Sequence, residues 1–281
     1  MKALICGAGV AGLSLAQRLV TIGWDVTVVE RLSGPRDQGY MIDYWGLGYD
    51  AAHAMGVLPR MQELSYQVDE ACFLDDSGKR RARVKYARFE RAVHGRLLSI
   101  MRPDLELALR EQVAGTADLR WGCSIRHIEN ATDGVRISLT DETVLDADLL
   151  IGADGIHSTV RRLVFGDEKQ FIRYLGYHTA AYIFEDPQIF DIARNRFCLT
   201  DTIDRQMGFY SLRSGKVATF TVHRSADPTL PEEAQSAVRA SYSSLGWVAP
   251  QALAQCPPTS EVYYDQVAQI EIPQWSRGRV T

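Results

Sequence analysis

The sequence predicts an α/β fold in which a domain with a parallel sheet is intermixed with an α+β domain built on a mostly antiparallel sheet. Residues 2–6 form an apolar, strand-like segment that runs into a glycine-rich turn, a helix over 10–23 and a second strand over 26–29. From about residue 171, the chain contains aromatic-rich segments whose side chains alternate as they do along strands. In the segment 216–222 the alternation is that of a sheet with one solvent-exposed face. With 281 residues, the chain has room for one large domain or two intermixed ones.

The glycine-rich turn has the composition of a dinucleotide-binding motif. It reads Gly7-Ala8-Gly9-Val10-Ala11-Gly12. Gly7 allows the tight turn, Gly9 lets the backbone approach a diphosphate, and Gly12 lets the helix pack closely on the sheet. The helix then turns its unpaired N–H groups and positive end toward the phosphates. Glu30 ends the second strand 18 residues (30 − 12) after Gly12, where it should accept hydrogen bonds from a ribose diol. We therefore expect a Rossmann-like domain that binds NAD or FAD.

Other elements follow in order. The pattern predicts a loop over 32–49, helical stretches to 56 and over 58–64, a hairpin of 72–74 with 83–86, and a helix that opens at Arg102-Pro103. Short strands then follow at 119–121, 124–129, 135–139 and 143–145, and a buried strand at 149–152 leads into a turn and a helix. Residues 1–75 and 98–170 are expected to form the nucleotide-binding domain, 76–97 and 171–276 the substrate domain, and 277–281 a return strand to the first.

Composition excludes several classes of function. A net charge of −4, from 31 basic and 35 acidic residues, argues against a nucleic-acid partner. The five cysteines are odd in number and lack metal-ligand spacing, which favours free thiols in a reducing compartment. No apolar run approaches the length of a membrane span, and the start of the chain lacks the shape of a signal peptide. We expect a cytoplasmic protein without a metal site or membrane partner.

A second motif indicates which dinucleotide is bound. Residues 152–162, Gly-Ala-Asp-Gly-Ile-His-Ser-Thr-Val-Arg-Arg, resemble the "DG" motif of flavin-dependent aromatic hydroxylases. Three further features resemble that family: Arg31 follows Glu30, residues 102–105 match its R-x-x-L helix start, and residues 275–280 match its W-x-x-G-R-V strand. The chain is identified as a member of these class A flavoprotein monooxygenases, whose fold is like that of p-hydroxybenzoate hydroxylase, with an FAD-binding domain of the GR2 type.

The resemblance implies both chemistry and site residues. It implies FAD as cofactor, NAD(P)H as co-substrate, and oxygen transfer from a flavin C4a-hydroperoxide to an aromatic or polyketide-like molecule, with no catalytic residue supplied by the protein. It also implies that Arg102, Asp154 and Gly155 contact FAD. Within the family the likeness is nearest to tetracycline-inactivating and other antibiotic-modifying enzymes. Their loop pattern would bring Asp43 to FAD and Arg36 to the phosphate of the nicotinamide cofactor, although Gln38 stands where they have glycine.

Some residues have two interpretations. Arg102 could be merely a solvated residue at a helix start, but a cation is poorly placed at the positive end of a helix, which indicates an anionic partner. Asp154 could equally cap the helix that follows it. Arg161 and Arg162 could form a solvated face or bind NADPH, and a structural or surface role is favoured for His157.

The substrate pocket is expected between the loop 39–49 and the sheet near 209–220. Tyr210, Phe220 and His223 are its candidate lining residues.

The family pattern continues into a G-D-A-A segment where this chain stops, at Thr281. We therefore expect a truncated chain that alone binds FAD weakly or not at all. The alternatives are a non-catalytic fragment of such a flavoprotein, or a reductase or halogenase of the same fold. The oligomeric state is left open.

Overall fold

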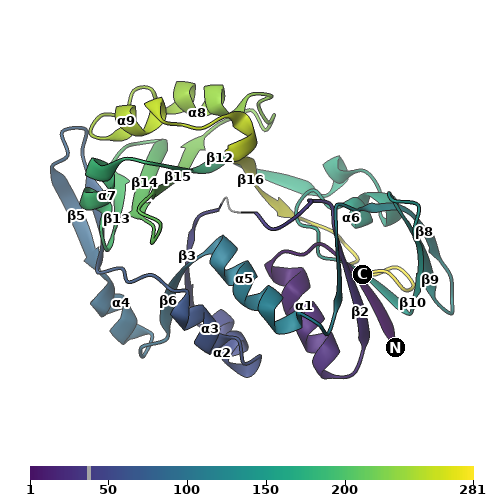
Figure 1. Ribbon diagram of the computed structural model, residues 1–281. Coiled ribbons are helices and arrows are strands. Elements are labelled where there is room, and N and C mark those ends of the chain that lie inside the picture. Colours follow the sequence, from purple (N-terminus) through teal and green to yellow (C-terminus); the bar gives the residue numbers. More distant parts are fainter. Residues whose placement is uncertain (37–38) are drawn as a thin grey trace.

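The computed structural model describes residues 1–36 and 39–281 and consists of two bodies built from the interleaved chain (Figure 1). The first, here called the parallel-sheet body, contains a sheet in the order β11-β1-β2-β7 with all strands parallel. Its strands are β1 (Lys2–Cys6), β2 (Asp25–Glu30), β7 (Asp118–Trp121) and β11 (Leu149–Gly152). Residues 3–6 of β1 are all buried, which explains the unbroken apolar run typical of parallel strands.

Two layers cover this sheet. Helices α1 (Val10–Thr21), α2 (Leu47–Ala54), α3 (Leu58–Glu63) and α5 (Arg102–Val113) bury their apolar side chains against one face. Leu13 and Leu109, from α1 and α5, meet in that layer, and the two helices run side by side (Figure 1). The other face packs on an antiparallel sheet of β8 (Ile125–Asn130), β9 (Val135–Leu139) and β10 (Val144–Ala147), with α6 (Thr159–Val164) beside it.

The segment 32–49, expected to be a loop, contains a strand and the start of a helix. Residues of β3 (Met41–Trp45) pair antiparallel with β6 (Leu97–Met101), and α2 begins at Leu47. The prediction was wrong here because the five-residue strand is ordered by a partner more than fifty residues away rather than by its own pattern. Gln38, which stands where the antibiotic-modifying enzymes have glycine, lies outside the described residues.

The second body, here called the large-sheet body, contains a sheet in the order β16-β12-β15-β14-β13-β4-β5 among the described residues. Every neighbouring pair is antiparallel except β13 and β4. Its strands are β4 (Glu70–Leu74), β5 (Arg80–Lys85), β12 (Ile172–Phe184), β13 (Arg196–Thr200), β14 (Arg205–Ser211), β15 (Val217–Arg224) and β16 (Tyr263–Ile270). Since β4 begins at residue 70, the large sheet reaches across the domain boundary expected after residue 75.

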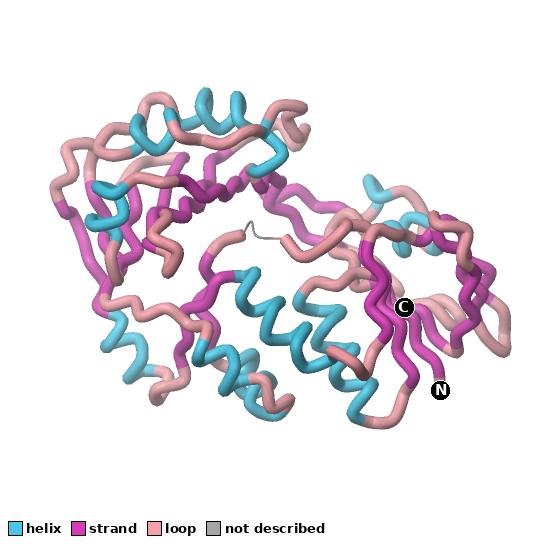
Figure 2. The backbone as a smooth tube through the Cα atoms, in the orientation of Figure 1, coloured by secondary structure: helices cyan, strands magenta, loops and turns pink. Residues whose placement is uncertain are grey.

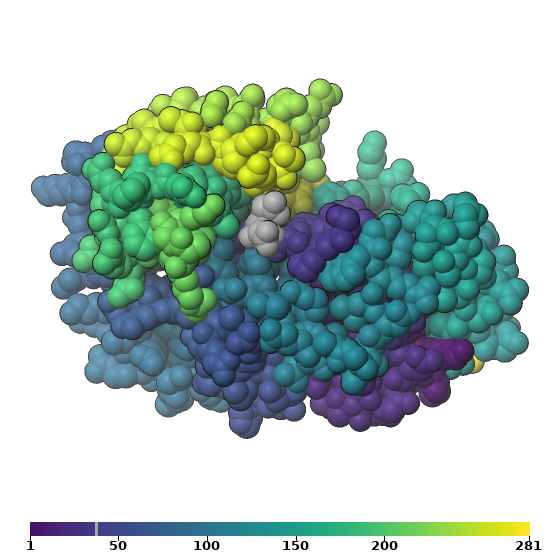
Figure 3. Space-filling view, viewed as in Figure 1, coloured from purple at the N-terminus to yellow at the C-terminus, as the bar shows by residue number. Residues whose placement is uncertain are grey.

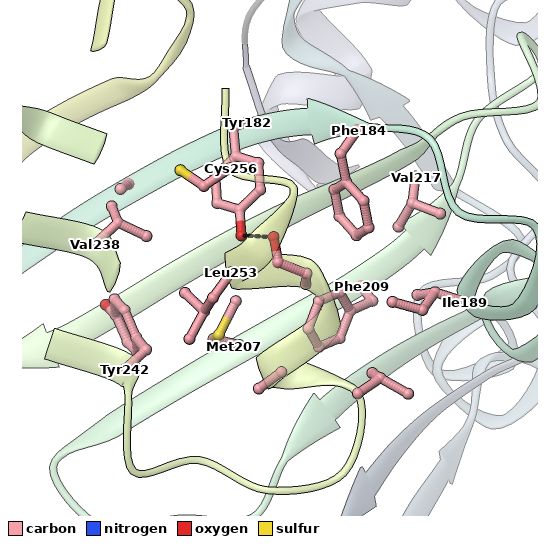
Figure 4. Close-up of a cluster of buried hydrophobic side chains, with 14 of the residues drawn as sticks. Tyr182, Phe184, Ile189, Met207, Phe209, Val217, Val238, Tyr242, Leu253 and Cys256 are labelled. Carbon is pink, nitrogen blue, oxygen red and sulfur yellow. Dashed lines mark hydrogen bonds between the residues drawn. The ribbon is translucent and has the colours of Figure 1, made fainter. Parts of the chain in front are cut away.

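Helices α7 (Pro187–Ala193), α8 (Ala234–Tyr242) and α9 (Ala249–Ala254) pack on the large sheet, with α8 and α9 above it in Figure 1. Figure 4 shows this core, in which the Tyr182 hydroxyl donates a hydrogen bond to the carbonyl oxygen of Ala252 at 3.0 Å. The expectation of a solvent-exposed face on residues 216–222 is wrong, because Ala218 and Thr219, on opposite faces of β15, are both fully buried. The remaining elements are α4 (Tyr86–Ala92), η1 (Glu168–Gln170) and η2 (Thr259–Glu261).

The end of the chain returns to the parallel-sheet body. Leu150 in β11 pairs in parallel with Val280, and Leu150 N–H donates to the Arg279 carbonyl at 2.9 Å. The backbone trace accordingly shows the C-terminus lying beside the first strands (Figure 2). The α/β fold with an intermixed, mostly antiparallel second sheet is confirmed. Among the described helices, none is both long and apolar enough to cross a membrane.

Candidate cofactor-binding cleft

A cleft of about 320 Å³ lies at the carboxyl ends of the parallel strands. It is lined by both bodies, which meet along a seam across the middle of the molecule (Figure 3). Eight of the predicted cofactor-binding residues line it: Gly7, Gly9, Glu30, Arg31, Arg36, Arg102, Asp154 and Gly155. Ligands of open α/β sheets bind at this edge.

The three glycines of the motif are required for different reasons. Gly7 has φ +108°, and a Cβ there would lie 2.5 Å from the Ala153 carbonyl oxygen. A Cβ on Gly12 would lie 1.9 Å from the Gly7 carbonyl oxygen, so only glycine lets α1 pack this closely. A Cβ on Gly9 would meet nothing nearer than 3.7 Å. Gly9 therefore leaves space in the cleft, whereas Gly7 and Gly12 serve the fold.

Glu30 holds the glycine-rich turn in place. Its Oε2 accepts a hydrogen bond from Ala8 N–H at 3.0 Å, and its Oε1 accepts one from Leu32 N–H at 3.0 Å. Each carboxylate oxygen keeps further acceptor capacity for a ligand hydroxyl. Val10 and Ala11 form the first turn of α1, whose N-cap residue, Gly9, has no side chain with which to cap it, so the positive end of the helix is available to an anion.

Arg102 finds an anionic partner inside its own helix. Its Nη2 lies 2.9 Å from Oε1 of Glu106, one turn further along α5. Glu106 is 8% exposed, and burial raises the pKa of its carboxyl group while Arg102 opposes that rise. The guanidinium thus lies in the cleft wall, 3.8 Å from where a Gly9 side chain would begin.

Asp154 does cap the following helix. Its Oδ2 accepts hydrogen bonds from Thr159 N–H at 2.7 Å and Val160 N–H at 3.2 Å. Its Oδ1 is buried and has no partner within residues 1–36 and 39–281. Burial, reinforced by the charge of Asp154, raises the pKa of the Cys6 thiol, whose sulfur lies 3.6 Å from Oδ2. Capping thus leaves one carboxylate oxygen free for another donor.

The arginines after this motif differ in environment. Arg161 is buried, and its Nη2 contacts the Ile156 carbonyl oxygen and lies 3.4 Å from Glu168 Oε2, so it holds the turn from within. Arg162 is exposed on α6.

Asp43 does not line the cleft. It lies on β3, where its two carboxylate oxygens accept hydrogen bonds from the Tyr86 hydroxyl and the Ser99 hydroxyl, each at 2.7 Å. Its contact with a cofactor stays a prediction.

Phe220 and Met41 of β3 both pack against the buried cluster that contains Tyr210, whereas His223 lies apart from them. The Tyr210 hydroxyl is buried and accepts a hydrogen bond from Met41 N–H at 2.7 Å, so Tyr210 joins the large sheet to β3. The Phe220 ring lies 5.5 Å from the ring of Tyr40, a cleft residue. His223, three positions after Phe220 on β15, points to the opposite face, where its Nδ1 lies 3.0 Å from the Tyr242 hydroxyl of α8. The expectation for His223 is therefore corrected by the two-residue period of the strand.

The cleft wall also contains residues that the sequence did not single out as ligands. Tyr40, Tyr263 and Asp265 line it together with His157, which was considered only for a structural or surface role. Burial, with a smaller contribution from Asp265, raises the pKa of Tyr263 to about 12. Tyr263 and Asp265 share one face of β16, but no local signal reveals which face a strand turns to a ligand.

The hydrogen-bonding and charged groups of the cleft fit the phosphate and ribose parts of FAD. The start of α1, the space beside Gly9 and the three arginines of the cleft (Arg31, Arg36 and Arg102) fit a ligand with phosphate groups, and Glu30 fits a ribose. In the described part of the chain, no group of three or more His, Cys, Asp or Glu side chains could hold a metal ion.

Comparisons with known proteins agree with this geometry. The family model for an FAD binding domain matches residues 1–247. An uncharacterized protein of Mycobacterium tuberculosis is 32% identical over 284 residues, covering 99% of this chain and 75% of the relative. An FAD-dependent monooxygenase of Sarocladium schorii is 26% identical over 294 residues, covering all of this chain and 68% of the relative.

A solved structure supports the fold. The crystal structure of tetracycline destructase Tet(51) aligns with a TM-score of 0.85 at 24% identity, covering 99% of this chain and 72% of that one. The chain therefore belongs to the FAD-binding domain family, and its relatives include flavin-dependent monooxygenases.

Proposed function

We propose that the cleft binds FAD and that the enzyme hydroxylates an aromatic or polyketide-like small molecule with NAD(P)H and O₂. The observation that carries this proposal is the convergence of a helix start, the carboxylate of Glu30 and three arginines (Arg31, Arg36 and Arg102) at one edge of a parallel sheet. The likeness to a tetracycline destructase supports the polyketide-like substrate class, because tetracyclines are polycyclic molecules of that kind.

Each wall of the cleft would have its own role. The backbone at Gly9 and the first turn of α1 would hold the diphosphate, and Glu30 would accept from the ribose. Arg102 would lie along the cofactor, Asp154 would order the turn beside it, and Arg36 would meet the phosphate of the nicotinamide co-substrate. Arg36 suits this role because it lines the cleft and also a wider opening beside it.

The aromatic end of the cleft would receive the substrate. When bound, FAD would supply the redox chemistry that takes a hydride from NAD(P)H and inserts one oxygen atom of O₂ into the substrate. Tyr40 and Tyr263 have ring centroids 6.2 Å apart, and Phe220 lies next to Tyr40. These rings would exclude water and orient an aromatic substrate by stacking. The bound flavin would supply the reactivity, so the reaction would need no nucleophilic side chain.

The binding step is tested by titrating FAD into the purified chain and following the quenching of flavin fluorescence. Tight binding by the wild type would support the proposed site and overturn the expectation that this chain alone binds FAD weakly or not at all. Glu30→Ala should weaken binding about tenfold or more, because the turn loses two acceptor contacts and the ribose loses its partner. Glu129→Ala, on an exposed strand of the small sheet, is the matched control and should bind as the wild type does. Equal binding by Glu30→Ala and wild type would refute the assigned site.

The reaction is tested by oxygen uptake and NADPH oxidation with phenolic and tetracycline-type substrates, with products analysed by mass spectrometry. A product that carries one added oxygen atom is the expected result. NADPH oxidation without any oxygenated product, across both substrate classes, would contradict the monooxygenase proposal and favour a reductase.

A further inference from the structure

His157 joins the two bodies at the edge of the cleft. It follows Gly155 and Ile156 in the turn that leads to α6. Its Nδ1 lies 3.1 Å from Oε1 of Glu168, which belongs to η1 in the same region of the chain. Its Nε2 lies 3.1 Å from Oδ1 of Asp265, which belongs to β16 of the large sheet. One imidazole ring thus links the DG-motif turn to the opposite wall of the cleft.

Only the protonated ring can make both of these contacts as hydrogen bonds to ionised carboxylates. An ionised carboxylate only accepts hydrogen bonds, whereas a neutral imidazole has one donor nitrogen and one acceptor nitrogen. A neutral His157 could therefore satisfy Glu168 or Asp265, but not both. Both contacts are hydrogen bonds only when the ring is an imidazolium.

The surroundings of His157 favour that charge. Burial lowers the pKa of the ring, but the hydrogen bonds from Asp265 and Glu168, together with their charges, raise it above its ordinary value. The side chain of Asp265 is 15% exposed, so this contact is partly shielded from water. Arg161, on α6, is the cation beside Glu168, at 3.4 Å. The other titratable or charged groups that line the same cleft are Cys6, Glu30, Arg31, Arg36, Tyr40, Arg102, Asp154 and Tyr263.

We propose that His157, as an imidazolium, is a positioning residue that makes FAD binding depend on pH. Its two hydrogen bonds, to Glu168 and to Asp265, hold the two walls of the cleft together and are here called the clasp. The coupling to FAD rests on the function proposed above. Loss of the proton leaves a ring lone pair facing a carboxylate, and one wall is released. Since the folded pKa is raised, the clasp is complete below the ordinary pKa of histidine and is lost as pH rises through the folded pKa. By reciprocity, bound FAD raises the pKa of His157 further.

The clasp is tested first without FAD, by NMR titration of the imidazole resonances of the full chain. The His157 signal, assigned by its absence in His157→Ala, should titrate above about 6.5, the ordinary histidine value. Its pKa should fall in both Glu168→Gln and Asp265→Asn. A His157 pKa at or below the ordinary value would overturn the clasp, whether or not FAD binds.

The coupling is tested by measuring FAD affinity between about pH 6.5 and pH 9 through flavin fluorescence. In the wild type, affinity should fall about fivefold to tenfold over this range as one charged hydrogen bond is lost. In His157→Ala, affinity should be weak and flat at every pH. His127→Ala is the matched control, because His127 lies beside Glu129 on the surface, and it should keep the wild-type profile.

Asp265→Asn distinguishes the clasp from simple packing. The side-chain amide introduced by this substitution can donate to a neutral ring whose other nitrogen donates to Glu168, so the variant should keep tight binding but lose the pH dependence. A wild-type affinity that does not change with pH, or an unchanged pH profile in Asp265→Asn, would overturn the coupling. Absence of FAD binding at any pH, together with a raised His157 pKa, would instead refute the proposed function and with it the coupling.

Discussion

Replacing Gly9 with alanine is expected to weaken FAD binding without weakening the fold. Gly9 has φ −82° and ψ −174°, an extended conformation that any residue adopts. An added Cβ would meet only Glu106 Oε1 at 3.7 Å and Arg102 Nη2 at 3.8 Å, which are ordinary contacts. The methyl group would fit the protein, but it would stand in the space that Gly9 leaves in the cleft.

The size of both effects follows from this geometry. The free energy of unfolding should stay within about 1 kcal/mol of wild type, because alanine restricts the unfolded chain more than glycine does but is the poorer N-cap residue for α1. Affinity for FAD should fall tenfold or more, about 1.4 kcal/mol, since the backbone can no longer approach the diphosphate. Gly12→Ala is the contrasting variant: its Cβ would lie 1.9 Å from the Gly7 carbonyl oxygen, an overlap that costs about 1–3 kcal/mol or more of stability.

Two measurements separate these outcomes. Urea unfolding followed by circular dichroism reports stability, and quenching of flavin fluorescence reports affinity. The reasoning is refuted if Gly9→Ala binds FAD as tightly as wild type, or if it loses as much stability as Gly12→Ala.

Three further predictions concern stability. Tyr210→Phe should lower the free energy of unfolding by about 1–2 kcal/mol, because Met41 N–H loses its acceptor, and thermal denaturation unchanged from wild type would contradict this. Burial lowers the pKa of both His178 and His223, so the unfolded chain binds more protons below about pH 6.5 and stability should fall as pH drops through that value. Urea midpoints from pH 7.5 to 5.5 should show a shallower slope in His178→Gln, and equal slopes would count against this origin. Ser158→Ala should cost about 1 kcal/mol of stability in the same urea assay, because its hydroxyl accepts from Arg161 N–H at 2.9 Å at the start of α6; no change would show that the cap is redundant.

Local sequence patterns correctly predicted those elements whose geometry depends on residues close together in the chain. The turn at residues 7–12, the helix opening at Arg102 and the hairpin around residues 75–78 are all found where the sequence predicts them. In each, the decisive feature is local: a glycine that must adopt a positive φ, a proline in a first helical turn, or a polar turn between two strands.

Local sequence patterns did not predict which strands pair with each other or which face of a strand a side chain occupies. The five residues of β3 are a strand because β6 lies beside them, and His223 faces α8 because the strand period places it opposite Phe220. Nothing within a few residues of either segment carries that information.

The amino-acid sequence was sufficient to predict the fold class, the FAD-binding family and most of one wall of the cleft, because glycine geometry, helix starts and strand-end acids are properties of short segments. The opposite wall became visible only in the folded molecule, where Asp265 contacts His157, more than one hundred residues away in the chain, and Tyr263 lines the same cleft. The physical reason is that hydrogen bonds between acceptor and donor groups act over about 3 Å in space, and the folded sheet alone decides which distant residues come that close.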